Sequence, residues 1–378
     1  GPTLEPCLDR LAAQTFSDFE TILIDNASTD GAPQAAVAAD PTLRFLEPHA
    51  NLGFAAGNNL AAREARGRWL VLLNPDAYAK PDWLEALVAG TLRHPDVRCF
   101  TSLQMAADEP GLMDGAGDVM TSAGIPFRGG YRRRRPESLP EGEVFSACGA
   151  ATLIDRDLFL GLGGFDERFF CYCEDVDLGY RLRLAGEATL LLPGAVVEHV
   201  GSASTGVRSD FSVFHGTRNR IWTFVKNTPP LLLWLTTPLH VAVTFGLLLL
   251  HARRGDAPPV IRGIRAALKR EALAPILASR RELQATRKAG SWEILKAMAI
   301  EGHGLAFLPA SSVARELKSG RLVRAAPEGQ FELSMDLRIY RERPELARHN
   351  KAGALALWEF LRGEARGEPR ANPQAARP

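Results

Sequence analysis

The sequence predicts an α/β fold in which strands and helices alternate around a parallel sheet that carries helices on both faces. Two observations support this prediction. Short apolar runs alternate with helix-like segments through residues 3–94, and 46% hydrophobic with 24% charged residues is the composition of an ordinary folded protein. With 378 residues, the chain is long enough for two to three domains of about 150 residues each.

The first half of the alternation ends at the His-Pro step at 94–95. Residues 3–14 predict an amphipathic helix, because Leu4, Leu8 and Leu11 fall on one face. The elements expected after it are a buried strand at 21–25, a helix near 33–39, a short strand at 43–47, a helix at 57–66, a strongly apolar strand at 69–74 and a helix capped by Asp82. Because ligands of such sheets bind at the carboxyl ends of the strands, the polar residues there are the first site candidates.

The second half continues the pattern beyond a charged loop. Residues 128–143 are rich in Arg, Pro and Glu and include four successive arginines at 132–135. Such a loop is either solvated or a clamp on a phosphate-bearing substrate. Beyond it we expect a strand, a helix start and a Gly-rich turn within 144–170, a helix within 171–186, and a strand from 190 that leads into a loop carrying His199.

Two carboxylates stand directly after apolar strands. Asp25 can accept hydrogen bonds from a nucleotide base or ribose, or it can start the next helix through an Asx turn. Asp76 follows Asn74 and Pro75 and is placed to bind a hard divalent cation, although all three residue types also form turns. Neither position alone decides between its two interpretations.

Adjacent carboxylates open the helix within 171–186. Glu174 and Asp175 can cap the N-terminus of the helix and interact favourably with its dipole, or they can supply a general base. Together with Asp177 they place three carboxylates close together, and the repulsion among them is greater than a helix cap alone would require. A lone His is commonly structural, so His199 is a metal ligand only if it faces Asp76.

An apolar stretch and a basic stretch follow the α/β region. Residues 231–250 carry no formal charge apart from a possible one on His240, and a helix of this length would span about 30 Å, the thickness of a bilayer core. Residues 251–290 hold ten basic side chains against three acidic ones. A single span would place this tail outside, against the positive-inside tendency. We therefore expect a re-entrant or interfacial helix pair with the tail on anionic lipid, and a buried soluble helix is the alternative.

The charge balance and the cysteines exclude several classes of protein. Lys+Arg is 45 and Asp+Glu is 44, so the net charge of +1 argues against a globally basic nucleic-acid binder. Five Cys without a CxxC pair fit a reducing compartment and give no zinc-knuckle spacing. Residues 1–20 lack a basic region followed by an apolar one, so no signal peptide is expected.

From 291 the pattern predicts a small α/β piece, with a disordered tail at 366–378.

The order and spacing of five motifs are more specific than any one of them. The motifs are DNASTDG, ANLGFAAGNN, LVLLNPDA, GGFDERFF with CYCEDVDLGYRLRLAG, and EHVGSAS. In this order they resemble a family 2 glycosyltransferase of the GT-A type, in the branch of bacterial rhamnosyltransferases and galactofuranosyltransferases, over residues 1–225. The apolar and basic stretch at 226–290 is similar to tails in that branch.

The resemblance implies a role for each candidate residue. Asp175 would be the catalytic base, supported by Glu174, and Asp76 with His199 would hold a divalent metal, Mn²⁺ or Mg²⁺. Asn74 would take the first place of the family's DxD motif, where a neutral Asn is a weaker ligand. The donor-binding residues would be Asp25, Asn26, Asn51, Gly57, Asn58 and Asn74, while Arg218 and Asn219 would contact the acceptor or a phosphate.

The implied activity is metal-assisted, inverting glycosyl transfer. A nucleotide-sugar donor, either dTDP-rhamnose-like or a UDP-sugar, would give its sugar to a hydroxyl of a lipid-linked or polysaccharide acceptor in one displacement. The implied place is the cytoplasmic face of the bacterial inner membrane, in the synthesis of cell-surface polysaccharide. We expect the protein to bind an anionic membrane surface, and we expect no nucleic-acid partner.

Two departures from the family pattern bear on function. Family members begin with a strand, so we expect the GT-A domain here to lack its first strand and its activity or stability to be impaired. Residues 291–365 resemble the last part of the effector-binding domain of LysR-type regulators, which implies a fusion rather than a working regulator. The alternatives to an active transferase are a catalytically impaired nucleotide-sugar-binding relative and, with less support, a transcription-regulator fragment.

Overall fold

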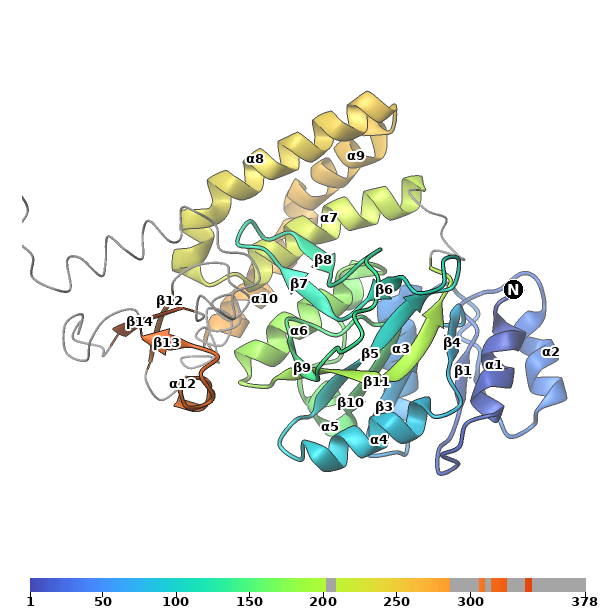
Figure 1. The fold of residues 1–378 in the computed structure, drawn as a ribbon. Coiled ribbons are helices and arrows are strands. Elements are labelled where there is room, and N and C mark those ends of the chain that lie inside the picture. The colour runs from blue at the N-terminus through green and yellow to red at the C-terminus, as the bar shows by residue number, and fades with distance from the viewer. Residues whose placement is uncertain (202–208, 286–305, 310–313, 325–336, 342–378) are drawn as a thin grey trace, which may run out of the picture. The chain divides into compact units, whose positions relative to one another are not determined.

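The structure is a computed structural model that describes residues 1–201, 209–285, 306–309, 314–324 and 337–341 (Figure 1). The chain divides into two compact units, Gly1–Lys288 and Ala289–Pro378. The first unit holds the candidate site residues.

The first unit opens with a small parallel β-pair flanked by helices. Its elements are α1 (Leu4–Ala12), β1 (Ile22–Ile24), α2 (Ala32–Ala39), β2 (Arg44–Leu46) and α3 (Gly53–Glu64). β1 pairs in parallel with β2 over its whole length, and its three residues are half-buried. The expectation of a buried strand here is therefore wrong, because among the described residues β2 is the only strand that pairs with β1.

A seven-stranded sheet forms the centre of the unit. Its main path runs β3–β10–β5–β11–β4, with β6 paired to β5 and β9 to β11. The strands are β3 (Trp69–Leu73), β4 (Ala77–Ala79), β5 (Cys99–Ala106), β6 (Met113–Gly115), β9 (Gly142–Val144), β10 (Ala151–Asp155) and β11 (Thr189–His199). β5 and β11 are parallel, but β10 runs antiparallel to β3 and β5, and β4 antiparallel to β11.

The sheet is therefore mixed, and the prediction of a parallel sheet is wrong in this respect. All five residues of β10 are buried. A strand buried on both faces reads as a continuous apolar run whichever way it points, so the hydrophobic pattern does not reveal its direction.

Helices cover both faces of the sheet, as predicted (Figure 1). The neighbours Leu153 and Ile154 of β10 belong to different hydrophobic clusters, because successive side chains of a strand point to opposite faces. Leu153 packs with Trp83 and Leu87 of α4 (Trp83–Arg93). On the other face, Ile154 packs with residues of α3, α5 (Arg156–Gly161) and α6 (Glu174–Leu184).

A hairpin interrupts the alternation between β6 and β9. It consists of β7 (Asp118–Met120) and β8 (Pro126–Arg128), which pair with each other and not with the main sheet. The backbone of Asp118 is hydrogen-bonded to that of Ser146, in the segment before β10. This hairpin brings charged side chains to the site described below.

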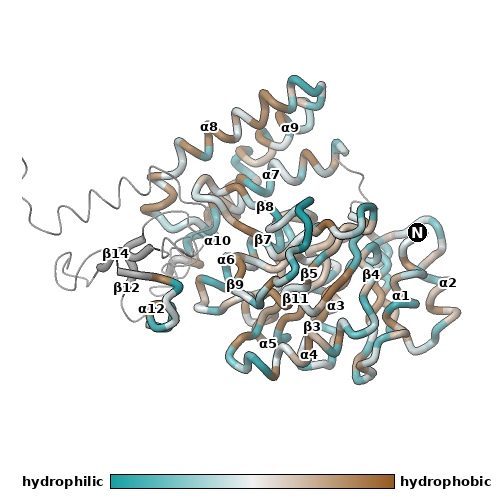
Figure 2. The backbone as a smooth tube through the Cα atoms, viewed as in Figure 1, coloured by the Kyte–Doolittle hydropathy of each residue, from teal (hydrophilic) through white to brown (hydrophobic). Residues whose placement is uncertain are grey.

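Four long helices complete the first unit: α7 (Asp210–Asn227), α8 (Pro230–Arg254), α9 (Ala257–Leu268) and α10 (Arg270–Ala285). Trp222 of α7 donates from its indole nitrogen to the carbonyl oxygen of Ala267 in α9 at 3.1 Å. Residues 231–250 form one unbroken helix with Pro238 inside it. Among the described residues, α8 alone is long and apolar enough to cross a membrane by length and composition (Figure 2).

The described part of the second unit is a three-stranded antiparallel sheet with one short helix. The strand order is β12–β14–β13, with β12 (Ala306–Pro309), β13 (Val323–Arg324) and β14 (Leu337–Arg341), and the helix is α12 (Ala314–Ser319). The predicted tail at 366–378 lies outside the described residues, as does most of 291–365.

Candidate active site

Asp76 and His199 meet at one end of the main sheet. His199 is the last residue of β11 and lies opposite Ala77 of β4, so the residue before that strand faces the imidazole. The carbonyl oxygen of Asp76 accepts from the amide of Val200 at 2.9 Å. Oδ1 of Asp76 lies 3.4 Å from Nε2 of His199, and both side chains are buried. The condition set by the sequence, that His199 faces Asp76, is met.

The Asp76–His199 pair fits a shared divalent ion but does not surround one. Among the described residues, no three His, Cys, Asp or Glu side chains form a group that could hold a metal. A separation of 3.4 Å lets one ion bind both side chains at about 2.0–2.2 Å. Mg²⁺ sites of this kind commonly use one or two protein ligands and complete the coordination shell with substrate phosphate and water.

The other nitrogen of His199 is held by a residue that the sequence analysis missed. Nδ1 lies 2.7 Å from Oδ2 of Asp114 in β6, and the same carboxylate is ion-paired with Arg128 of β8. Burial alone would lower the pKa of His199, but the hydrogen bonds to Asp114 and Asp76 raise it. In the sequence, Asp114 could have been found from the two acidic residues at 114 and 118 in an otherwise apolar run, because a buried charge needs a partner.

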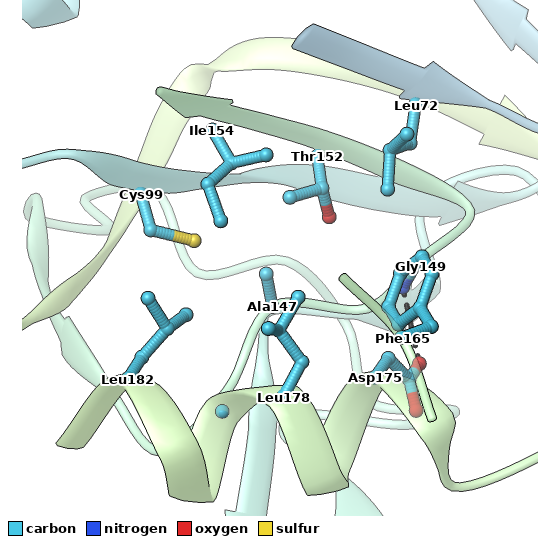
Figure 3. Close-up of a pocket in the computed structure, with 11 residues that line it drawn as sticks. Leu72, Cys99, Ala147, Gly149, Thr152, Ile154, Phe165, Asp175, Leu178 and Leu182 are labelled. Atoms are coloured by element: carbon cyan, nitrogen blue, oxygen red, sulfur yellow. Dashed lines mark hydrogen bonds between the residues drawn. The ribbon is translucent and has the colours of Figure 1, made fainter. Parts of the chain in front are cut away.

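Asp175 lies in the first turn of α6, where its carboxylate is fixed by two backbone amides. Oδ2 accepts from Gly149 at 3.1 Å and Oδ1 from Val176 at 2.8 Å. The side chain borders a small cavity between α6 and the sheet, lined largely by apolar residues such as Leu72, Phe165 and Leu178 (Figure 3). Burial raises the pKa of Asp175 even though these hydrogen bonds act in the opposite direction.

Two further carboxyl groups share the surroundings of Asp175. Glu174 is buried, and burial together with the charge of Asp175 raises its pKa well above the ordinary value. Asp118 of β7 is also buried, and burial with the charge of Asp175 raises its pKa to about 8. Raised carboxyl pKa values bring a general base closer to the working pH, which is typical of catalytic sites.

Asp177 belongs to a different environment although it lies on the same helix. Lys226 of α7 contacts Oδ1 at 2.8 Å, and Nε of Arg181 donates to Oδ2 at 2.9 Å. Burial alone would raise the pKa of Asp177, but these cations lower it. Asp177 is therefore a structural anion whose ion pair with Lys226 ties α6 to α7. This pairing reduces the electrostatic repulsion among the three neighbouring carboxyl groups.

The predicted donor residues between β1 and α3 hold the two elements together. The side chain of Asn26 donates to the carbonyl oxygen of Gly53 at 3.0 Å and accepts from the amide of Leu52 at 2.8 Å. Gly57 lies on the buried side of α3, and a Cβ there would lie 3.8 Å from Nδ2 of Asn26. Asn51 accepts from the amide of Gly53 at 2.9 Å. The start of α3 is thus anchored to the carboxyl end of β1.

The remaining donor candidates make local contacts. Asp25 is buried and accepts from the amide of Ser28 at 2.7 Å and from Gln34 at 3.2 Å. Burial alone would raise the pKa of Asp25, but these hydrogen bonds lower it, so the carboxylate is charged at neutral pH. Asn58 donates to the carbonyl oxygen of Phe54 in its own helix, and the backbone of Asn74 pairs with Ala150.

Arg218 and Asn219 lie in α7 and turn toward the segment that precedes α6. Asn219 is fully buried, and its amide nitrogen donates to the carbonyl oxygens of Phe169, Cys171 and Tyr172 at 2.7–2.9 Å. Arg218 donates to the carbonyl oxygen of Phe169 at 2.9 Å and lies over the ring of Trp222. These contacts leave Asn219 no free donor for an acceptor or a phosphate.

The sequence of the chain is similar to that of known proteins. A sequence profile for glycosyl transferase family 2 matches residues 1–161. An N-acetylglucosaminyl-diphospho-decaprenol L-rhamnosyltransferase of Mycobacterium tuberculosis is 36% identical over 234 residues, which cover 54% of this chain and 74% of that protein. This chain belongs to glycosyl transferase family 2. The predicted family and the predicted glycosyltransferase class are thereby confirmed.

Further matches concern the sequence, the fold and the C-terminal part of the chain. The O-antigen biosynthesis protein RfbC of Myxococcus xanthus is 34% identical over 53% of this chain and 16% of that protein. The structure of GalNAc-T7 with UDP, GalNAc and Mn²⁺ shares the fold, with a TM-score of 0.54 and 14% identity over 84% of this chain and 55% of that chain. The predicted GT-A fold is confirmed. A profile for the LysR substrate binding domain matches residues 245–366, which confirms that the C-terminal part holds a LysR-like segment. The match begins within α8, earlier than the predicted start at 291.

Proposed function

We propose that this family 2 glycosyltransferase moves L-rhamnose from dTDP-L-rhamnose to a hydroxyl of a lipid-linked diphospho-sugar, with inversion at the anomeric carbon. The transferred sugar and the acceptor class are those in the name of the 36% identical relative, an N-acetylglucosaminyl-diphospho-decaprenol L-rhamnosyltransferase. The dTDP carrier is the one that the family resemblance implies for rhamnose. A UDP-sugar is the alternative donor. The observation that carries the proposal is the pair formed by Asp76 and His199, 3.4 Å apart, in a chain of this family.

Asp76 and His199 are proposed to hold Mn²⁺ or Mg²⁺ together with the donor diphosphate. When bound, the ion neutralises the charge that develops on the departing nucleoside diphosphate. The residues of the chain prepare the site: Asp114 holds Nδ1 of His199, so that Nε2 faces Asp76. Donor binding is assigned to Asp25, Asn26, Asn51, Gly57, Asn58 and Asn74, around the ends of β1 and β3 and the start of α3.

Asp175 is proposed as the general base. Its carboxylate is held by the amides of Gly149 and Val176, and its raised pKa suits it to take the proton of an acceptor hydroxyl as that oxygen attacks the sugar. Burial and the charge of Asp175 raise the pKa of neighbouring Glu174 well above its ordinary value and so favour its neutral form, in which it supports Asp175 without a second negative charge.

The exposed face of α8 is proposed to bind the cytoplasmic face of the bacterial inner membrane. The side chains of α8 that turn toward the protein are polar, since His240 stacks on Phe224 and Thr244 contacts Arg220. Its apolar side chains face outward instead, including Leu231, Trp234 and Phe245. Arginines at its C-terminal end and along α9 supply charge for anionic lipid, which matches a lipid-linked acceptor.

The test is thermal unfolding of the purified chain with dTDP or UDP, each with and without Mn²⁺. At about 100 times the dissociation constant, a ligand adds about 2.7 kcal/mol to the folded domain. We expect the largest stabilisation with dTDP and Mn²⁺ together, and Asp76→Asn and His199→Ala should lose the part that needs Mn²⁺. Asp96→Asn serves as a control on the helix-to-strand loop before β5. A larger stabilisation by UDP than by dTDP would show that the donor is a UDP-sugar. If neither nucleotide gives a stabilisation that depends on Mn²⁺, the proposed metal site is wrong.

A further inference from the structure

We propose that Asn219 is a positioning residue that clamps the strained segment 169–173 and thereby fixes Asp175. This inference rests on the proposed role of Asp175 as the base. Asn219 lies in α7, whereas the segment that it holds ends at Cys173, the residue directly before α6.

One side chain satisfies three carbonyls of this segment. The two N–H bonds at Nδ2 of Asn219 are shared among the carbonyl oxygens of Phe169 at 2.9 Å, Cys171 at 2.8 Å and Tyr172 at 2.7 Å. Its Oδ1 accepts from Nε of Arg218 at 2.9 Å, which fixes the orientation of the amide. Because Asn219 has no exposed surface, water cannot replace these hydrogen bonds without opening the packing between α6 and α7.

The segment needs such a clamp because its backbone is strained. Phe170, Tyr172 and Cys173 have φ angles of 64°, 72° and 64°, in the left-handed region that residues with a side chain rarely adopt. Strained conformations of this kind persist only where the surrounding contacts determine them, and they concentrate at functional sites. The unusual turn brings three carbonyls of the segment to a single amide.

A second anchor, in α3, holds the same segment. The carbonyl oxygen of Phe170 accepts from the amide of Ala55 in α3 at 3.1 Å. Gly53 permits this approach, because a Cβ at that position would lie 2.6 Å from the same oxygen. The α3 anchor is made by backbone, whereas the α7 anchor is made by side chains, since Arg218 also donates to the carbonyl oxygen of Phe169. A substitution at Asn219 therefore removes the larger part of the α7 anchor, three carbonyl contacts, and leaves the α3 anchor in place.

The position of Asp175 follows from the clamp. Cys173 precedes α6, and its carbonyl oxygen accepts the helical hydrogen bond from Asp177 at 2.9 Å. Asp175 lies between these two residues and reaches the amide of Gly149 at 3.1 Å. Loosening 169–173 therefore moves the first turn of α6 and its carboxylate relative to Gly149.

The cysteines of the chain provide a direct test. Cys171 and Cys173 lie within the clamped segment and are half-buried, while Cys7, Cys99 and Cys148 are buried elsewhere in the unit. We would label the full chain with iodoacetamide and follow each thiol by mass spectrometry. Asn219→Ala and Asn219→Asp should speed labelling of Cys171 and Cys173 by about tenfold or more and leave the other three within about twofold.

Asn227→Ala is the matched control. Asn227 is also a buried amide of α7, but it donates to Asp177 rather than to the clamped segment. This variant should not accelerate labelling of Cys171 and Cys173 selectively. Equal acceleration of all five thiols by Asn219→Ala would show a general structural role and overturn the proposal, as would unchanged labelling.

Transfer kinetics separate positioning from mere folding. With dTDP-L-rhamnose as the donor and a synthetic diphospho-lipid-linked N-acetylglucosamine as the acceptor, Asn219→Ala should lower kcat by about a hundredfold and leave the donor KM within about twofold. A raised donor KM with unchanged kcat would refute the link to Asp175. If Asp175→Asn keeps full transfer, the base assignment is wrong, and the catalytic half of this inference falls with it. The labelling result tests the clamp independently.

Discussion

Nδ1 of His199 lies 2.7 Å from Oδ2 of Asp114, while Nε2 of the same ring lies 3.4 Å from Oδ1 of Asp76. A neutral imidazole that donates from Nδ1 presents a lone pair at Nε2, the arrangement expected of a His that binds a metal. Asp114 therefore acts on the proposed metal through the orientation of the ring and not as a ligand.

Removing the carboxylate of Asp114 should weaken metal binding. We expect Asp114→Ala to lower the affinity for Mn²⁺ in the presence of dTDP by about 10–100-fold, the usual effect of losing such a partner. Electron paramagnetic resonance of free Mn²⁺ measures this affinity. Asp114→Asn should lose less, because its amide oxygen still accepts from Nδ1. Asp108→Asn is the control, since it breaks an exposed pair with Arg132 without reaching His199. Full affinity in Asp114→Ala would contradict the role of Asp114.

Neutralising the proposed base should affect chemistry and not donor binding. Asp175→Asn keeps the shape of the side chain but cannot take a proton, so kcat should fall by about 10²–10⁴-fold. The metal-dependent stabilisation by dTDP should stay as in the unsubstituted chain, because it depends on Asp76 and His199. Full transfer by this variant would show that another group removes the acceptor proton.

The sequence placed several candidates at the ends of elements. It made a metal role for His199 conditional on this residue facing Asp76, and β4 and β11 bring the two side chains together. It was insufficient where a long-range contact decides the role of a residue. Asn219 depends on three carbonyls about 50 positions earlier in the chain, and Asp114 on a pairing with β5 that no local pattern signals. The direction of β10 was missed for the same reason, since burial on both faces hides it.

Asp118 should make stability depend on pH. Its pKa is raised to about 8 by burial and by the charge of Asp175, whereas in the unfolded chain an Asp titrates near pH 4. Between about pH 4 and pH 8 the folded state keeps a proton that the unfolded state has released. The free energy of unfolding therefore falls as pH rises across this window, by on the order of 1 kcal/mol per pH unit from this group.

Asp118→Asn removes this proton difference. We expect urea unfolding between pH 5 and pH 8 to show a smaller loss of stability with rising pH in the variant than in the unsubstituted chain. Asp108→Asn is again the control, because the hydrogen bond from Arg132 lowers the pKa of Asp108 and puts its contribution below this window. Parallel pH dependences for the unsubstituted chain and Asp118→Asn would show that Asp118 is charged in the folded state.

The outward apolar face of α8 should determine membrane binding, and two leucines allow a matched comparison. Leu231 on α8 is 74% exposed, and Leu92 on α4 is 78% exposed. Transfer of a Leu side chain from water to an apolar phase is favourable by about 1.5–3 kcal/mol, and Glu adds repulsion from anionic lipid. Leu231→Glu should therefore weaken binding to phosphatidylglycerol-containing vesicles by about tenfold or more, while Leu92→Glu should not. Co-sedimentation with these vesicles measures both variants. Equal losses in the two, or unchanged binding in a Leu231→Glu, Trp234→Glu double variant, would place the membrane contact elsewhere on the protein.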